Sequence, residues 1–218
     1  METETLTIQE IGKAAERALE YQRYIFRRTY GVYYLVWGAA MVLLLSTDLS
    51  AAIGLTGNLA SGVEVALSLV VIIAAFFATA LIFRGALRTL GLRRALSSER
   101  RGYAHYFVAW IVGIYVVIAA ADLLAPAYSY AVFDALLLPV PFVLYFMQGL
   151  AFPDGRPTEG LIALTTYGGA AAINLTLSLI GLDSWVLGWV WAGTATVWFL
   201  AAFYALFRAP EELEALRG

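Results

Sequence analysis

The 218-residue chain contains no cysteine, a single histidine, His105, and a single lysine, Lys13. Without cysteine the chain cannot form disulfides, iron–sulfur clusters, thiolate zinc sites or covalent c-type haem attachments. One histidine excludes a bis-histidine haem or a histidine-rich metal site within one chain. The lysine lies outside every long apolar run, which excludes a retinal Schiff base in a membrane helix. We therefore expect no cofactor and no bound metal.

Charged residues are also scarce, at 14% of the chain, whereas hydrophobic residues make up 61%. A typical soluble domain is about 25% charged and about 45–50% apolar, so this chain has too little polar surface to cover a globule in water. The same apolar excess excludes intrinsic disorder. The sequence therefore predicts an all-α integral membrane protein whose excess apolar surface faces lipid.

Long apolar runs divide the chain into six expected transmembrane helices, since about 20 mostly apolar residues are needed to cross a bilayer. The connectors between them are short and contain glycine, proline, asparagine or aspartate. Short connectors make sequential helices antiparallel neighbours, so we expect three hairpins in one six-helix bundle over residues 30–207. The six spans cover residues 30–47, 61–83, 103–124, 131–152, 160–180 and 184–207.

The basic residues predict the orientation of this bundle. All 14 Lys and Arg residues lie before the first span, between spans two and three, between spans four and five, or after span six. Cytoplasmic segments of membrane proteins carry such an excess of basic residues. We therefore expect a multi-pass protein of a cell membrane with both termini in the cytoplasm. The preference for arginine over lysine and the lack of cysteine are typical of a GC-rich prokaryotic genome.

The two ends of the chain are expected to lie outside the bilayer. Residues 1–29 predict an amphipathic helix, because apolar side chains recur there near helical spacing among charged ones. Such a helix is expected to lie on the cytoplasmic leaflet and then turn into the first span; a docking surface for a cytoplasmic partner is the alternative. Residues 208–218 predict a short cytoplasmic tail in which Pro210 suits the first turn of a helix. The apolar stripe consists of Ile8, Ile11, Ala15, Leu19 and Phe26.

Polar side chains in the outer halves of the expected spans are the candidate ligand-binding or ion-binding residues. Ionisable groups inside a bilayer are costly and are functional candidates by default. The external half holds carboxylates and no basic residue, so a cleft there would concentrate cations. The alternative is structural, because a carboxylate near the start of a helix stabilises the helix dipole and can accept free N–H groups. The candidates are Glu64, Asp122, Asp134 and Asn174.

Pro139 and Pro141 lie one residue apart within the fourth expected span. Neither has an N–H, so together they are expected to break the hydrogen-bond ladder of that helix. Carbonyls freed at such a break can line a cavity close to Asp134 and bind a cation. The alternative is a packing kink that holds no ligand.

The loop between spans two and three carries six arginines with leucines among them. One interpretation is a short helix that contacts a soluble cytoplasmic partner such as an ATPase. The other is orientation by positive charge together with binding of anionic lipid, which needs no protein partner. Since the membrane explains the clustered arginines, we expect no nucleic-acid partner. The arginines are Arg84, Arg88, Arg93, Arg94, Arg100 and Arg101.

These features favour transport or channel-like conduction of a cation or small solute through an outward-facing acidic cavity. One six-helix bundle with so few internal charges makes a poor pore alone, and a homo-oligomer would make a better one. The alternative is a non-catalytic membrane subunit or anchor of a larger complex that docks an ATPase or another soluble partner. No convergent acid, base or nucleophile constellation is present, so we expect no enzymatic activity.

The topology can be tested by adding single cysteines to this cysteine-free chain. Because positive charge places the basic segments in the cytoplasm, cysteines at Thr56 and Ser129 should react with an impermeant thiol reagent from outside. Cysteines at Ser97 and Thr158 should react only from inside. Reversed labelling, or an odd number of crossings, would contradict the six-span topology.

Overall fold

The computed structural model describes residues 8–45, 58–91, 129–152, 155–181 and 184–214, with scattered residues between 113 and 124. Regular secondary structure in these residues is entirely helical, as the sequence predicts. Helix α6 is followed almost directly by α7, so the two together form one span-length segment. The helices are α1 (Ile8–Leu45), α3 (Asn58–Thr89), α6 (Ser129–Leu137), α7 (Val140–Ala151), α8 (Thr158–Leu179) and α9 (Ser184–Glu214).

Five helical segments are long and apolar enough to cross a membrane, judged by length and composition. They are α1, α3, the α6–α7 pair, α8 and α9, and they correspond to the first, second, fourth, fifth and sixth expected spans. The third expected span, 103–124, lies mainly outside the described residues. The count of six therefore stays a prediction.

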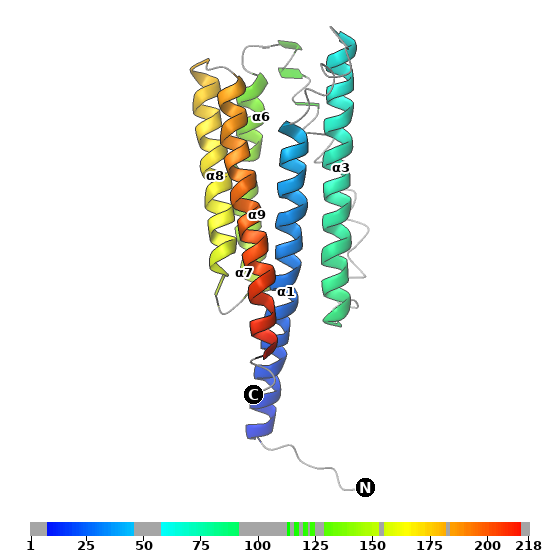
Figure 1. Ribbon diagram of the computed structural model, residues 1–218, viewed down its shortest axis with the longest axis vertical. Coiled ribbons are helices and arrows are strands. Elements are labelled where there is room, and N and C mark those ends of the chain that lie inside the picture. The colour runs from blue at the N-terminus through cyan, green and yellow to red at the C-terminus, as the bar shows by residue number, and fades with distance from the viewer. Residues whose placement is uncertain are drawn as a thin grey trace.

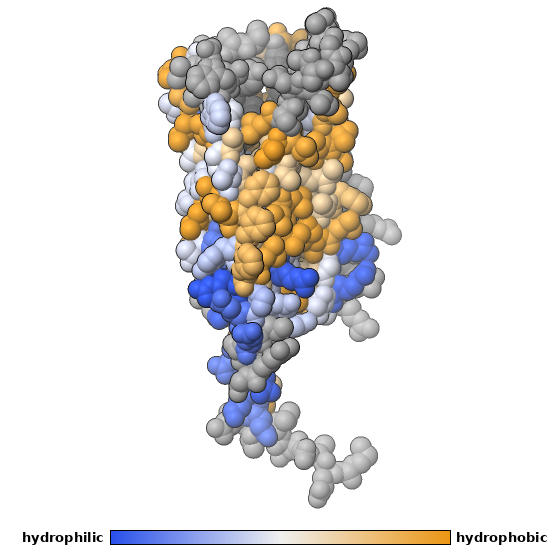
Figure 2. Space-filling model, viewed as in Figure 1, coloured by the Kyte–Doolittle hydropathy of each residue, from blue (hydrophilic) through white to orange (hydrophobic). Residues whose placement is uncertain are grey.

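The described helices lie side by side in an elongated bundle (Figure 1). Helix α1 packs most extensively against α9; α3 packs on α1, and α8 packs on α9, α6 and α7. One end of the bundle, which we call the basic end, contains the start of α1, the end of α3, the start of α8 and the end of α9. The described lysine and arginine residues gather there, and Figure 2 shows hydrophilic residues at this end and a hydrophobic surface above it.

Helix α1 is a single continuous helix, so the expected turn between an interfacial helix and the first span is wrong. Its 38 residues correspond to about 57 Å at 1.5 Å per residue, well beyond the roughly 30 Å of a hydrocarbon core. Residues 10–19 are all exposed, and the N-terminal part of α1 projects beyond the bundle at the basic end (Figure 1). The region around residue 30 stays helical because it is packed tightly against α9.

Helix α9 also continues further than expected. It runs to Glu214 with Pro210 inside it, so Pro210 does not open a separate helix. Ala205 and Ala209, on the last turns before and beside this proline, are buried. Packing therefore extends α9 beyond residue 207, the end expected for the sixth span.

Aromatic rings from several helices form the centre of the bundle. Trp198 of α9 is 1% exposed, and its indole N–H donates to the Ala163 carbonyl at 3.0 Å. The centroid of its ring lies 5.5 Å from that of Tyr34 on α1 and 5.7 Å from that of Tyr167 on α8. Tyr30 and Tyr33 of α1 pack edge-on against Phe83 of α3. Small residues allow this close approach, and the buried face of α9 includes Ala195, Ala201, Ala202, Ala205 and Ala209.

Gly31 tests the close packing of α1 against α9. A Cβ at this position would lie 2.9 Å from Leu206 Cγ and 3.3 Å from the Ala202 carbonyl oxygen. We expect Gly31→Val to cost about 1–3 kcal/mol through overpacking, lowering the thermal unfolding midpoint in detergent by roughly 2–10 °C. Gly193→Val is the control, because a Cβ there meets nothing within 4 Å. Equal midpoints for the two variants would contradict the α1–α9 packing.

Candidate functional site

Two groups of buried and partly buried polar side chains interrupt the apolar interior. The first, at the basic end, is called the Arg27 network and consists of Arg27, Tyr34, Gln148, Glu159 and Glu212. The second, toward the opposite end, is called the Asp134 group and consists of Asp134, Asn174 and Ser178. Since buried polar groups cost free energy unless they are paired, each group needs a physical explanation.

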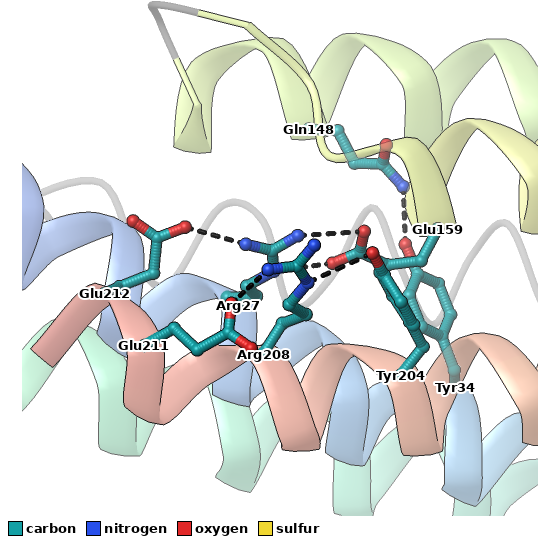
Figure 3. A network of polar contacts seen from close by, with 8 residues as sticks. All are labelled: Arg27, Tyr34, Gln148, Glu159, Tyr204, Arg208, Glu211 and Glu212. Atoms are coloured by element: carbon teal, nitrogen blue, oxygen red, sulfur yellow. Dashed lines mark hydrogen bonds and ion pairs between the residues drawn. The ribbon is translucent and has the colours of Figure 1, made fainter. Parts of the chain in front are cut away.

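Arg27 joins three helices at the basic end (Figure 3). Its Nε and Nη2 donate to the two carboxylate oxygens of Glu159 at 2.7 and 3.1 Å, and its Nη1 donates to Glu212 at 2.7 Å. The guanidinium thus binds α8 by a two-pronged contact and α9 by a third bond, which is geometry that lysine cannot reproduce. Arg27 therefore connects α1 to α8 and α9.

The burial of Glu159 makes this ion pair structurally important. Glu159 is 3% exposed, whereas Arg27 is 17% and Glu212 26% exposed. Glu159 also lies in the first turn of α8, where the helix dipole favours a negative charge. Loss of Arg27 would leave a nearly buried carboxylate without its counter-charge, so the network depends on Arg27.

Gln148 and Tyr34 extend this network into the aromatic centre. Gln148 is 1% exposed, and its Nε2 donates to the Tyr34 hydroxyl at 2.8 Å. Its Oε1 is buried without a hydrogen-bond partner among the described residues. A Cβ on Gly160 would lie 2.7 Å from that oxygen, so glycine at this position makes the room that Gln148 occupies.

A second arginine cluster lies beside the network but faces outward. Arg208 is ion-paired with Glu211 and donates from Nε to the Tyr204 hydroxyl at 3.1 Å (Figure 3). Arg208 and Glu211 are 47% and 56% exposed. Exposed ion pairs contribute little to stability, so this cluster is a surface feature of the basic end.

The Asp134 group connects α6 to α8. Asp134 is 3% exposed, and its Oδ2 accepts a hydrogen bond from Ser178 Oγ at 3.0 Å. Asn174, one turn before Ser178 on α8, is 0% exposed, and neither atom of its amide has a partner in the part of the chain that the structure describes. A buried amide with no partner requires an explanation such as a bound water or ion.

The fourth expected span is interrupted where its two prolines lie. Helix α6 ends at Leu137 and α7 begins at Val140, and the Leu138 N–H donates to the Ala135 carbonyl at 3.3 Å rather than one residue further back. Neither proline can donate an N–H, so the carbonyl of Leu137 loses the donor that residue 141 would supply in a continuous helix. The break therefore releases backbone acceptors.

The buried face of α8 carries polar groups at several levels of the bundle. Glu159, Tyr167 and Asn174 lie on it, with Ser178 one turn beyond Asn174. From Glu159 to Ser178 this face covers about 28 Å at 1.5 Å per residue. Between the two groups, the buried ring of Tyr167 packs against Trp191 and Trp198 of α9. The rest of this buried face is apolar and consists of Gly160, Ala163, Leu164, Ala170 and Ala171.

The structure brings together only part of the predicted site. Asp134 and Asn174 lie in one group on neighbouring helices. The side chain of Glu64 and all of Asp122 lie outside the described residues, so the acidic cavity expected from these four residues stays a prediction. Arg84 and Arg88 are exposed near the end of α3. The remaining arginines of the predicted contact loop, Arg93, Arg94, Arg100 and Arg101, lie outside the described residues.

Sequence reasoning did not identify Arg27, Gln148 and Glu159 as site residues. Gln148 lies inside the fourth expected span and is an uncharged polar residue of the same kind as Asn174, so it could have been selected by the same criterion. Glu159 lies one residue before the fifth expected span. The pairing of Arg27 with Glu159 joins residues 132 positions apart, and no local pattern predicts it.

Comparisons of the chain with protein families, curated proteins and solved structures found no match. The functional argument therefore depends on the buried polar side chains themselves.

The Arg27 network can be tested by removing its central cation. Arg27→Met leaves Glu159 buried and unpaired, and breaking such a pair costs about 3–5 kcal/mol. We expect the thermal unfolding midpoint in detergent to fall by roughly 6–12 °C or more. The double variant Arg27→Met/Glu159→Gln should recover much of that loss, because it removes the unpaired charge.

Arg28→Met is the matched control for this test, since Arg28 is exposed and donates to the Tyr24 hydroxyl one turn away on its own helix, at 3.4 Å. It should change stability by at most about 1 kcal/mol. Similar midpoints for Arg27→Met and Arg28→Met would contradict the structural role given to the network.

Proposed function

We propose that the protein is a small membrane transport protein that moves a small cation across a bilayer. The observation that carries this proposal is the presence of two polar groups, one around Asp134 and one around Arg27, inside an otherwise apolar bundle. Polar groups in such an interior are costly and mark ion pathways in membrane proteins. Two of these side chains, Asp134 and Glu159, are buried and acidic, and acidic side chains attract cations.

The separation of the two polar groups supports a path across the membrane. Glu159 and Ser178, which belong to the two groups, lie about 28 Å apart along α8, close to the roughly 30 Å of a hydrocarbon core. Five helical segments of sufficient length and apolarity supply the surrounding bundle. The basic residues at one end support an orientation with that end, and both termini, in the cytoplasm.

A second candidate is a non-catalytic membrane subunit that binds a soluble partner. The projecting part of α1 favours it, because Ile11 and Leu19 are 54% and 41% exposed beyond the bundle. Arg84 and Arg88 are exposed at the same end. These residues supply a surface at the basic end but do not account for the buried polar side chains, so transport is the first proposal.

Reconstitution in liposomes tests the transport proposal. The purified protein should carry sodium, potassium or protons down an imposed gradient, followed with ion-sensitive dyes inside the vesicles. Tyr34→Phe removes the hydroxyl that accepts a hydrogen bond from Gln148, and leaving the buried Gln148 amide unsatisfied costs about 1–3 kcal/mol. On the proposed pathway the Tyr34 hydroxyl stabilises the passing ion. We therefore expect flux to fall about tenfold or more, since about 1.4 kcal/mol of barrier corresponds to a tenfold change in rate.

Tyr30→Phe is the control for Tyr34→Phe, because it removes a hydroxyl from the same aromatic cluster without touching Gln148. Its flux should match that of the unaltered protein. Absence of flux from the unaltered protein would contradict transport and leave the subunit candidate. Equal losses in the two variants would contradict the pathway through Tyr34.

A further inference from the structure

We propose that Asp134, Asn174 and Ser178, together with backbone carbonyls at the proline break, form a binding site for one monovalent alkali-metal cation. The site deepens the proposed transport function, on which its role in translocation rests, although binding itself does not require transport. Each member comes from α8 or from the broken α6–α7 segment.

The charge of Asp134 is the first argument. Asp134 is 3% exposed, and the hydrogen bond that it accepts comes from the neutral hydroxyl of Ser178. No lysine or arginine of the described segments pairs with it; those residues gather at the basic end. A buried carboxylate needs a compensating charge or a proton. A bound cation of charge one compensates it fully, whereas a divalent cation leaves an excess positive charge.

The unpartnered amide of Asn174 is the second and independent argument. Both polar atoms of this amide are buried without a partner in the described part of the chain, although Asn174 is 0% exposed. Such a group is retained at a cost of about 1–3 kcal/mol unless something else satisfies it. The amide oxygen is a hard, neutral oxygen ligand of the kind that alkali cations coordinate.

The register of the two antiparallel segments places Asn174 beside the break. Asp134 is bonded to Ser178, and further along the same pair of segments Pro141 lies 3.4 Å from the position of a Cβ on Gly168. Asn174 lies between Gly168 and Ser178 on α8. The turn at residues 138–139 lies between Asp134 and Pro141 on the opposing segment.

The proline break supplies the remaining acceptors. The carbonyl of Leu137 has lost the donor that a non-proline residue would provide at position 141, and unwound backbone carbonyls in membrane bundles coordinate alkali cations. The donor set is therefore one carboxylate with neutral oxygens. No group of three or more acidic, histidine or cysteine residues able to hold a metal occurs in the described residues, which favours a cation of charge one over a divalent metal.

Direct binding to the full-length protein in detergent tests the site. Radioactive sodium or rubidium should bind at about one ion per chain at neutral pH, and unlabelled sodium or potassium should displace it while choline should not. The thermal unfolding midpoint should rise when sodium or potassium chloride replaces choline chloride at constant ionic strength, since a ligand that binds the folded state stabilises it. Magnesium chloride at equal ionic strength should not reproduce that rise.

Variants assign the binding to this site. Asp134→Asn should abolish it, and Asn174→Leu and Ser178→Ala should each weaken it at least tenfold. Thr194→Val, which removes a buried hydroxyl that bonds only the Val190 carbonyl of its own helix α9 among the described residues, should leave affinity for the cation unchanged. If Asp134→Asn does not fold, Ser178→Ala and Asn174→Leu decide the assignment on their own.

Two outcomes would overturn the site. One is the absence of any alkali-cation binding by the unaltered protein, with stability that instead rises on acidification, because Asp134 would then hold a proton. The other is full binding by a folded Asp134→Asn variant or by both of the milder variants. Binding without flux in liposomes would retain the site and reject transport, whereas flux that persists in Asp134→Asn would retain transport and reject a role for the site in it.

Discussion

The pairing of Arg27 with Glu159 is the contact on which the arrangement at the basic end depends. Glu159 begins α8 in a nearly buried position, and the guanidinium of α1 neutralises it with two bonds while a third reaches Glu212 of α9. A buried pair of this kind adds little net stability compared with apolar residues of the same size, but breaking it is costly. It therefore selects one arrangement of α1, α8 and α9 over others that would separate the charges.

The two ends of α8 differ in how their buried polar side chains are paired. At the basic end, the carboxylate of Glu159 is paired with Arg27 of the same chain. Toward the other end Asp134 receives one hydroxyl, and Asn174 receives nothing from the described residues. Along α8 the buried polar side chains thus change from Glu159, which is ion-paired, to Asn174, whose amide has no partner among the described residues. Such unevenness is typical of sites where a ligand completes the hydrogen bonding.

The helical architecture and most membrane-length segments could be predicted from the sequence, because apolar runs and breakers are local signals. The prolines likewise indicated where α6 would end. The turn expected before the first span was wrong, because the charged residues near position 28 suggest a boundary, whereas packing of Gly31 against Leu206 keeps α1 helical. The network around Arg27 could not be predicted, since its partners come together only when α1, α8 and α9 pack.

The continuity of α1 joins its projecting N-terminal arm, residues 10–19, directly to the helical segment that carries Arg27 and Tyr34. About ten exposed residues precede the segment that carries Arg27, and no break separates them from it. A rigid helix transmits tilt and rotation along its whole length, so a displacement of the projecting arm pivots Arg27 relative to Glu159 and turns Tyr34 relative to Gln148. Tilting of the arm would therefore change the contacts of Arg27 and Tyr34 inside the bundle.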